Sequence, residues 1–299
     1  MTHIGFVGAT GLMGHGIAKN LVTKGFPLSY VLRRPSERVA DLAAAGAVEA
    51  ASYADLGGTC DVVVLCVTSS ADVEAVVTGG LLTAPREGLV IIDTSTSEPS
   101  STLRLAAEAA AQGVRYVDAP LTLGPAEAEA GTLNVIVGAD DDLFEEVRPV
   151  IEAFAGFIVR PGGLGAGHTL KLLNNFAVFA LASSLAEAFA VAAKSGLDPQ
   201  SVEDILGVSS MNCTLLHNMA KALRGDYTGM RFQLDNARKD LRYYTRLAGE
   251  NSVVAPVGAG VHETLAIASA LGYGGESVPS MVKAQAQLNG VEIAARVRV

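Results

Sequence analysis

A lysine and an asparagine stand four residues apart in the run Gly-Leu-Gly-Ala-Gly-His-Thr-Leu-Lys-Leu-Leu-Asn-Asn, residues 163–175. In a helix, Lys171 and Asn175 project from the same face, and Gly165 and Gly167 before them allow another backbone or a flat ligand to approach closely. An ammonium group beside a carboxamide is suited to exchanging a proton with a substrate oxygen. The alternative interpretation is an ordinary interface helix whose lysine extends to solvent.

The composition excludes several classes of function. The 299 residues carry a net charge of -9 at pH 7 and no basic block longer than two residues, so binding to a nucleic-acid backbone has no electrostatic basis. Three cysteines without metal-like spacing are expected to be buried free thiols, as in a reducing cytoplasm. We therefore expect a cytoplasmic protein that acts on a small polar molecule, with no metal and no nucleic acid.

The longest apolar segment, residues 176–193, approaches the length of a membrane span. Glu187 and the pair Ser183 and Ser184 interrupt it, so we expect a buried helix of a soluble protein and no membrane interaction. The chain also begins without a basic segment or a small-residue cleavage site, which argues against secretion.

Short apolar runs alternate with alanine-rich segments in the first half of the chain, and each run is a nearly continuous stretch of Val, Ile and Leu. This pattern is typical of parallel strands covered by helices on both faces. From Thr169 onward the pattern is helical, and no flexible linker precedes it. The strands expected are residues 4–7, 28–32, 62–67, 90–92 and 116–117, with 133–137 and 157–159 extending the sheet.

A glycine-rich turn follows the first expected strand and precedes a helix. Gly8, Gly11 and Gly14 have the spacing G-x-x-G-x-x-G, one residue longer than the usual dinucleotide-binding turn. Its position predicts a cofactor pyrophosphate at the helix N-terminus, although a purely structural turn is the alternative. Arg33 and Arg34 stand where an acidic residue would bind the ribose of NAD. They predict NADP(H) in preference to NAD(H), unless they are merely solvated.

The predicted fold class is α/β, with an N-terminal doubly wound, Rossmann-type sheet and a C-terminal all-helical domain joined by a long helix. Residues 1–163 form the NADP-binding domain, and residues 164–299 form a helical domain for substrate binding and oligomerisation. We expect a homodimer or homotetramer formed through the helical half.

Taken in order, several runs resemble the β-hydroxyacid dehydrogenase family over nearly the whole chain. They are IGFVGATGLMG, LRRPSER, LCVTSSADV, DTSTSEP, DAPLTLGPAEAEAGTLNVIVG, GAGHTLKLLNN and ARKDL. The resemblance implies an NADP-dependent oxidoreductase that interconverts a small 3-hydroxy acid and its semialdehyde or 3-oxo acid by hydride transfer.

The resemblance also implies roles for individual residues. Lys171 is the general acid/base, Asn175 holds the substrate oxygen, and Lys239 comes from the helical domain to the cofactor. Thr96 lies beside the nicotinamide ribose. The residues implied to contact the cofactor are Gly8, Gly11, Leu12, Met13, Gly14, Arg33, Arg34, Val67, Thr68, Thr96 and Lys239.

The expected substrate-binding run departs from the family pattern, in which Ser-Gly-Gly follows Asp-Ala-Pro and binds the substrate carboxylate. This chain has Thr122, Leu123 and Gly124 there, and Glu127 stands where a small residue is common. Thr122 keeps a hydroxyl group, whereas Leu123 adds a branched side chain. These changes indicate a different or partly apolar acid.

Two other functions remain open. An imine or ketone reductase on the same scaffold is one, although its relatives usually lack a lysine at the position of Lys171; a non-catalytic NADPH-binding protein is the other. His168 is expected to be a cap or surface group and not a proton relay, and Asp240 is expected to orient its neighbours.

Overall fold

The computed structural model describes residues 1–296, and its internal contacts divide the chain into Met1–Lys171 and Leu172–Val299. The division falls inside the long helix α8 (Ala166–Lys194), whose length agrees with the expected connecting helix. The domain boundary at 163/164 stays a prediction.

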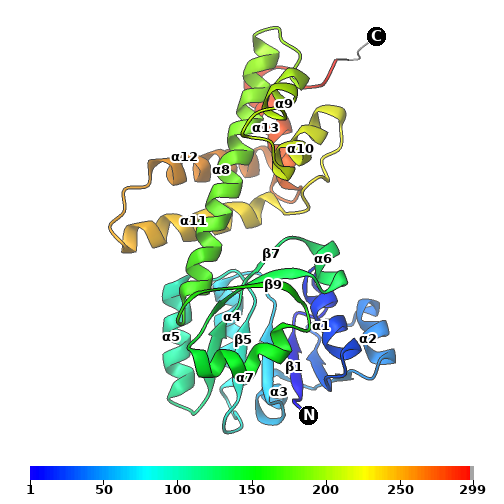
Figure 1. The fold of residues 1–299 in the computed structure, drawn as a ribbon, viewed down its shortest axis with the longest axis vertical. Coiled ribbons are helices and arrows are strands. Elements are labelled where there is room, and N and C mark those ends of the chain that lie inside the picture. The colour runs from blue at the N-terminus through cyan, green and yellow to red at the C-terminus, as the bar shows by residue number, and fades with distance from the viewer. Residues whose placement is uncertain (297–299) are drawn as a thin grey trace. The chain divides into compact units, whose positions relative to one another are not determined.

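The N-terminal unit is built on one nine-stranded sheet, with the order β3-β2-β1-β4-β5-β6-β8-β7 and with β9 paired to β8 (Figure 1). Neighbouring strands are parallel, except that β8 is antiparallel to both β6 and β7. The strands are β1 (Ile4–Val7), β2 (Leu28–Val31), β3 (Val48–Glu49), β4 (Val62–Leu65), β5 (Val90–Asp93), β6 (Arg115–Asp118), β7 (Leu121–Thr122), β8 (Leu133–Gly138) and β9 (Ala155–Gly162).

Helices cover both faces of this sheet because successive strand residues enter two different cores. In β4, Val62 and Val64 join one apolar cluster, whereas Val63 and Leu65 join the other. The first cluster includes residues of α1 (Gly14–Thr23), α2 (Ala40–Ala44), α6 (Pro125–Ala130) and α7 (Asp141–Ile151). The second includes residues of α3 (Tyr53–Thr59), α4 (Ser70–Val76) and α5 (Pro99–Ala110). The doubly wound prediction is confirmed.

Two short strands were absent from the sequence prediction. Both residues of β3 are exposed at the sheet edge, so no apolar run marks this strand. The other, β7, has only two residues and follows directly on Pro120. Their pairing partners, rather than their own sequences, make them strands.

The ends of the central strands form a straight row. Val7 pairs with Leu65, Leu65 with Asp93, and Asp93 with Asp118. The glycine turn after Val7 and the loop after Asp118 therefore leave the sheet at the same carboxyl edge, where open α/β sheets bind ligands.

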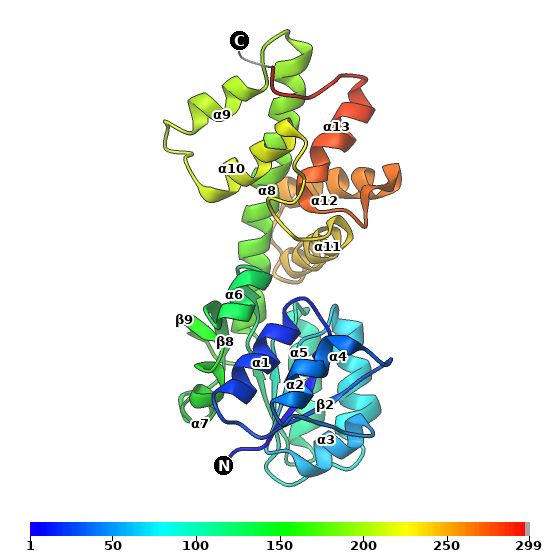
Figure 2. The same cartoon turned by 90° about the vertical axis from the view of Figure 1, so that its right-hand side faces the viewer.

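Short connecting helices complete the N-terminal unit. They are η1 (Glu37–Val39) and η2 (Val77–Leu81). Packing of α6 against α1 is tight, and the two helices lie side by side (Figure 2). A Cβ atom on Gly16 would lie 2.4 Å from the backbone carbon of Ala128, and the Asn20 amide donates to the Ala128 carbonyl at 3.0 Å.

Among residues 172–296 the regular elements are all helices, joined by loops, apart from one isolated bridge between Gln233 and Ser277. In the view of Figure 2, α9 and α10 lie on one side of α8, and α11, α12 and α13 lie on the other. The elements are α9 (Gln200–Leu206), α10 (Thr214–Ala220), η3 (Lys221–Arg224), α11 (Leu234–Glu250), α12 (Pro256–Ala268), η4 (Ser269–Tyr273), η5 (Val278–Ser280) and α13 (Met281–Asn289).

The long helix α8 is less buried than the sequence predicts. By length and composition it is apolar enough to cross a membrane, but only 44% of its most apolar window is buried inside the protein. The expectation of a buried helix is therefore wrong for part of its surface, including Val191, which is 59% exposed. The core helix of a soluble protein passes the same test of length and composition, so this feature alone does not indicate a membrane span.

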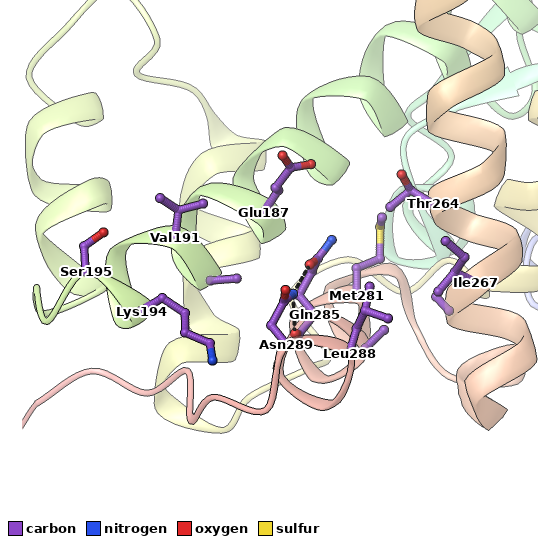
Figure 3. Close-up of a pocket in the computed structure, with 13 residues that line it drawn as sticks. Glu187, Val191, Lys194, Ser195, Thr264, Ile267, Met281, Gln285, Leu288 and Asn289 are labelled. Carbon is purple, nitrogen blue, oxygen red and sulfur yellow. Dashed lines mark hydrogen bonds between the residues drawn. The ribbon is translucent and has the colours of Figure 1, made fainter.

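An apolar groove accompanies this exposed part of α8 (Figure 3). It has a volume of about 480 Å³ and lies among α8, α12 and α13. Val191, Ile267 and Leu288 expose apolar surface there, and Glu187 and Lys194 add one charge of each sign.

Candidate active site

The glycine turn has a geometry that only glycine permits. Gly8 has a φ of 99°, and a Cβ atom on it would lie 2.1 Å from the Cys66 carbonyl oxygen. A Cβ atom on Gly14 would lie 2.2 Å from the Gly8 carbonyl oxygen, while the Gly11 N–H donates to that same oxygen at 2.9 Å. The helix α1 begins at Gly14 with no side-chain cap, and a helix N-terminus of this kind suits a phosphate group.

The remaining residues of this turn have different environments. Leu12 is 58% exposed, whereas Met13 packs against the first apolar cluster. The sequence places both at the cofactor, and this assignment stays a prediction.

The two arginines after β2 are exposed, as a charge-reading role requires. The Arg33 guanidinium donates to Asp72 Oδ1 at 3.2 Å and to Tyr53 Oη at 3.4 Å. Burial alone would raise the pKa of Asp72, but hydrogen bonds from Ser69 and Arg33 hold this pKa below its usual range. Asp72 thus keeps its charge and orients Arg33, while Arg34 stands beside it on the exposed loop.

The ends of β4 and β5 are joined by buried polar contacts. The Val67 N–H donates to Ser95 Oγ at 3.0 Å, and the Ser95 N–H donates to Asp93 Oδ1 at 2.9 Å. Thr96 is half-buried directly after this pair, and Thr68 is exposed directly after Val67. The three predicted cofactor residues of these loops therefore leave the sheet at the same edge as the glycine turn.

Asp118, at the end of β6, fixes the first turn of α8. Its two carboxylate oxygens accept the N–H groups of Gly165 and His168, each at 2.7 Å. A Cβ atom on Gly167 would lie 2.8 Å from the same carboxylate, so the close approach requires glycine. Burial raises the pKa of Asp118, although these hydrogen bonds and the nearby His168 oppose that shift.

His168 is buried, and the prediction of a cap or surface group is wrong. Its side chain has no exposed surface. Its Nδ1 lies 2.8 Å from Thr102 Oγ1, and its Nε2 lies 3.1 Å from the Ser95 carbonyl oxygen. His168 therefore links α5, the end of β5 and the start of α8, which the sequence does not indicate because these partners are distant in the chain.

Lys171 follows His168 on α8 and is 7% exposed. Because Lys171 is buried, the alternative interpretation of a lysine that extends to solvent does not fit. Asn175 lies four positions further along α8, in the C-terminal unit, and is also buried. Their spacing on one helix is the feature that the sequence predicts.

The C-terminal unit holds Asn175 in a polar chain. Its Nδ2 donates to Asp240 Oδ2 at 2.7 Å, and Asp240 Oδ1 lies 3.0 Å from the Lys239 ammonium nitrogen. Asp240 thus contacts its chain neighbour Lys239 and also Asn175, a contact across 65 residues that the sequence does not indicate. The roles of Asn175 and Lys239 toward a ligand stay predictions.

The predicted substrate-binding residues run from the end of β7 to the start of α6. Thr122 is half-buried, and Leu123 is 57% exposed with a φ of 76°. This left-handed backbone costs a residue with a Cβ atom about 1–2 kcal/mol. The Gly124 N–H is already bonded to Glu127 Oε2 at 3.0 Å.

Sequence reasoning also missed a histidine at the start of α1. His15 Nδ1 lies 2.7 Å from Glu129 Oε1, and its Nε2 lies 3.0 Å from Asp41 Oδ1. Neutral imidazole donates only one hydrogen bond, whereas the charged form satisfies both carboxylates. Burial alone would lower the pKa of His15, but the two carboxylates raise this pKa above its usual value. No local signal reveals this contact, because the partners come from α2 and α6.

Comparisons with known proteins agree along the chain. Residues 3–163 match the family described as the NAD binding domain of 6-phosphogluconate dehydrogenase. Residues 165–285 match the family described as NAD-binding of NADP-dependent 3-hydroxyisobutyrate dehydrogenase.

Individual proteins are similar over nearly their whole length. The 2-(hydroxymethyl)glutarate dehydrogenase of Eubacterium barkeri is 34% identical, covering 97% of each chain. The L-threonate dehydrogenase of Cupriavidus necator is 32% identical, covering 94% of this chain and 95% of that protein. The structure of Mycobacterium tuberculosis 3-hydroxyisobutyrate dehydrogenase with L-serine has a TM-score of 0.84 at 28% identity, covering 95% of this chain and 98% of that one. An imine reductase from Myxococcus stipitatus, at 16% identity and a TM-score of 0.64, shares only the fold.

The His15 contacts predict a pH-dependent stability. Because the folded pKa is raised above 6.5, the stabilisation is complete below about pH 6.5 and is lost as the pH rises through the folded value. We expect the free energy of unfolding of wild type to exceed that of His15→Gln by about 1 kcal/mol near pH 6, with the difference shrinking toward pH 9. Urea unfolding across this range measures the difference, with His262→Gln as the control. A difference that does not change with pH would contradict the prediction.

Proposed function

The chain belongs to the β-hydroxyacid dehydrogenase family, and from this premise we propose that it is an NADP-dependent oxidoreductase with Lys171 as its general acid/base. It interconverts a small 3-hydroxy acid and the corresponding semialdehyde or 3-oxo acid. The observation that carries the proposal is the buried Lys171 on a helix whose first turn is bonded to Asp118. That helix starts at the same sheet edge as the glycine turn.

The residues of the glycine turn fit a dinucleotide. A Cβ atom on Gly8 or Gly14 would fill the space beside the backbone, and the first N–H groups of α1 have no side-chain cap. These groups would hold the pyrophosphate of a bound dinucleotide, and the half-buried Thr96 would contact its nicotinamide ribose. When bound, the cofactor accepts or donates the hydride.

Lys171 moves the proton in this proposal. In oxidation, its neutral amine accepts the proton of the substrate hydroxyl; in reduction, its ammonium form returns the proton to the carbonyl oxygen. Burial keeps water from the amine, and attachment of the helix to Asp118 limits its movement. Asn175 binds the same substrate oxygen, with its amide oriented by Asp240.

Arg33 and Arg34 support NADP(H) as the preferred cofactor. Two exposed guanidinium groups after β2 can bind a ribose 2′-phosphate bidentately. Asp72 and Tyr53 orient Arg33. A carboxylate that would instead bind the ribose hydroxyls is absent from the positions of these two arginines.

The exposed apolar surface of the helical unit supports a homodimer or homotetramer. The groove among α8, α12 and α13 exposes Val191, Ile267 and Leu288. A second copy would remove this surface from water. An assembly of this kind also accounts for the apolar surface of α8 that a single chain leaves exposed. We place this assembly in the cytoplasm.

One prediction from the proposed function concerns the reaction. Wild type should turn over at least one of 3-hydroxyisobutyrate, 2-(hydroxymethyl)glutarate and L-threonate with NADP⁺, followed by NADPH absorbance. Lys171→Met should lower kcat/KM by about 10²- to 10⁴-fold because it removes the proton acceptor, while NADPH binding, followed by fluorescence, is retained. Lys24→Met, at an exposed lysine after α1, should keep full activity.

Other outcomes of this experiment favour other functions. Unchanged turnover by Lys171→Met contradicts the lysine mechanism. Reduction of imines or simple ketones without turnover of any hydroxy acid favours the imine or ketone reductase, and tight NADPH binding without any turnover favours a non-catalytic binding protein.

A second prediction concerns cofactor choice. Wild type should bind NADPH more tightly than NADH, and Arg33→Gln and Arg34→Gln should each weaken NADPH binding by about 10-fold while leaving NADH unaffected. Arg38→Gln, at a neighbouring exposed arginine, is the matched control. Equal affinity of wild type for both cofactors, measured by titration calorimetry, would show that these arginines do not read the phosphate.

A third prediction concerns assembly. Sedimentation velocity should give a dimer or tetramer for wild type, and the double variant Val191→Glu/Leu288→Glu should sediment as a monomer because it places charges in the apolar groove. Val254→Glu, at a residue 91% exposed before α12, should keep the assembly. A monomeric wild type would rule out the proposal.

A further inference from the structure

We propose that Leu123, in the loop after β7, and Glu127, in the first turn of α6, form a specificity element, which favours a 3-hydroxy acid with an apolar branch over one with a second carboxylate. The inference rests on the proposed function. It concerns which acids the enzyme accepts, and not how Lys171 moves the proton.

The loop is anchored at both of its ends by elements of the N-terminal unit. It follows the short strand β7, which starts soon after Asp118, the residue that holds the first turn of the helix carrying Lys171. It ends in α6, which packs on α1 through Gly16, while Asn20 donates to the Ala128 carbonyl. The loop thus leads from the strand that follows Asp118 to the helix that packs against α1.

Leu123 occupies its position at an energetic cost that the N-terminal unit does not offset. Its φ of 76° places Cβ close to the following carbonyl oxygen, and a glycine would avoid this crowding. Its side chain is 57% exposed, so little of the apolar group is removed from water. Among residues 1–296, Leu123 and Ser252 are the two residues other than glycine that have a positive φ. Strained residues that persist are concentrated at ligand sites, and an apolar ligand group would cover Leu123.

Glu127 makes the same loop unfavourable for an additional anion. Its carboxylate accepts the Gly124 N–H at 3.0 Å and is half-buried. A donor that could have bound a second substrate carboxylate is therefore already used. The charge of Glu127 also repels such a group. An uncharged branch suffers neither effect, and Thr122 keeps a hydroxyl for the single carboxylate of the substrate.

The test compares kcat/KM for 3-hydroxyisobutyrate, which has a methyl branch, with that for 2-(hydroxymethyl)glutarate, which has a second carboxylate. We expect wild type to favour the first. Leu123→Gly should lower this preference by about 10-fold, the effect of losing an apolar contact. Asparagine tolerates the same backbone conformation, so Leu123→Asn removes the apolar group without changing the loop. We expect Leu123→Asn to lower the preference by a similar factor, because the apolar side chain, and not the backbone strain, contacts the branch of the substrate.

Glu127→Gln tests the charge separately. Glutamine keeps an oxygen that can accept the Gly124 N–H, so the loop should keep its shape while losing its negative charge. We expect kcat/KM for the dicarboxylate to rise by about 5- to 10-fold, with little change for the methyl-branched acid. Glu152→Gln, at an exposed glutamate after α7, should change neither value.

Thermal unfolding separates strain from damage. Leu123→Gly should not lower the unfolding midpoint, because it relieves backbone strain at a positive φ. Ser252→Gly relieves the same kind of strain in the other unit. Preferences unchanged in Leu123→Gly, Leu123→Asn and Glu127→Gln, in an enzyme that turns over the acids, would overturn the inference while leaving the proposed function intact. An enzyme that turns over no acid in the panel would overturn both, and this result is recognisable from wild type alone.

Discussion

The Asp118 carboxylate is the contact on which the arrangement of the proposed site depends. It lies at the end of β6 and accepts two backbone N–H groups from the first turn of α8. These groups would have no partner inside the helix, so the carboxylate both caps the helix and fixes where it starts. The surrounding residues are shaped by it, since a Cβ atom on Gly138 would lie 2.3 Å from Asp118 Oδ1. Lys171 therefore has a defined position relative to the sheet edge.

A buried polar network extends from this contact across the sheet edge. His168 lies 3.8 Å from both Asp93 and Asp118, while its ring nitrogens also meet Thr102 and the Ser95 carbonyl. Asp93 in turn accepts hydrogen bonds from Ser97 and Tyr116. Burying such groups is unfavourable unless each is bonded, and a network of this kind selects one arrangement of its elements. It places the loops after β4, β5 and β6 in one frame, which a site built from all three requires.

The sequence predicts the features that depend on neighbours along the chain. Short apolar runs predict β1, β4 and β5, and the position of Gly8 after β1 predicts the turn. The features it misses depend on residues far apart. Nothing near His15 indicates Asp41 or Glu129, and nothing near His168 indicates Thr102, because each contact is made only after α1 or α8 is placed. Likewise, apolar composition predicts that α8 is a helix, but it cannot say which part of it another surface covers.

Gly8 and Leu123 show how two residues with positive φ can have opposite meanings. At Gly8, any side chain would collide with the Cys66 carbonyl, so the fold itself demands glycine. At Leu123, the backbone also favours glycine, yet a leucine stands there and extends into solvent. Fold stability explains the first residue and argues against the second. The contact with an apolar ligand group proposed for Leu123 would supply an advantage that folding does not.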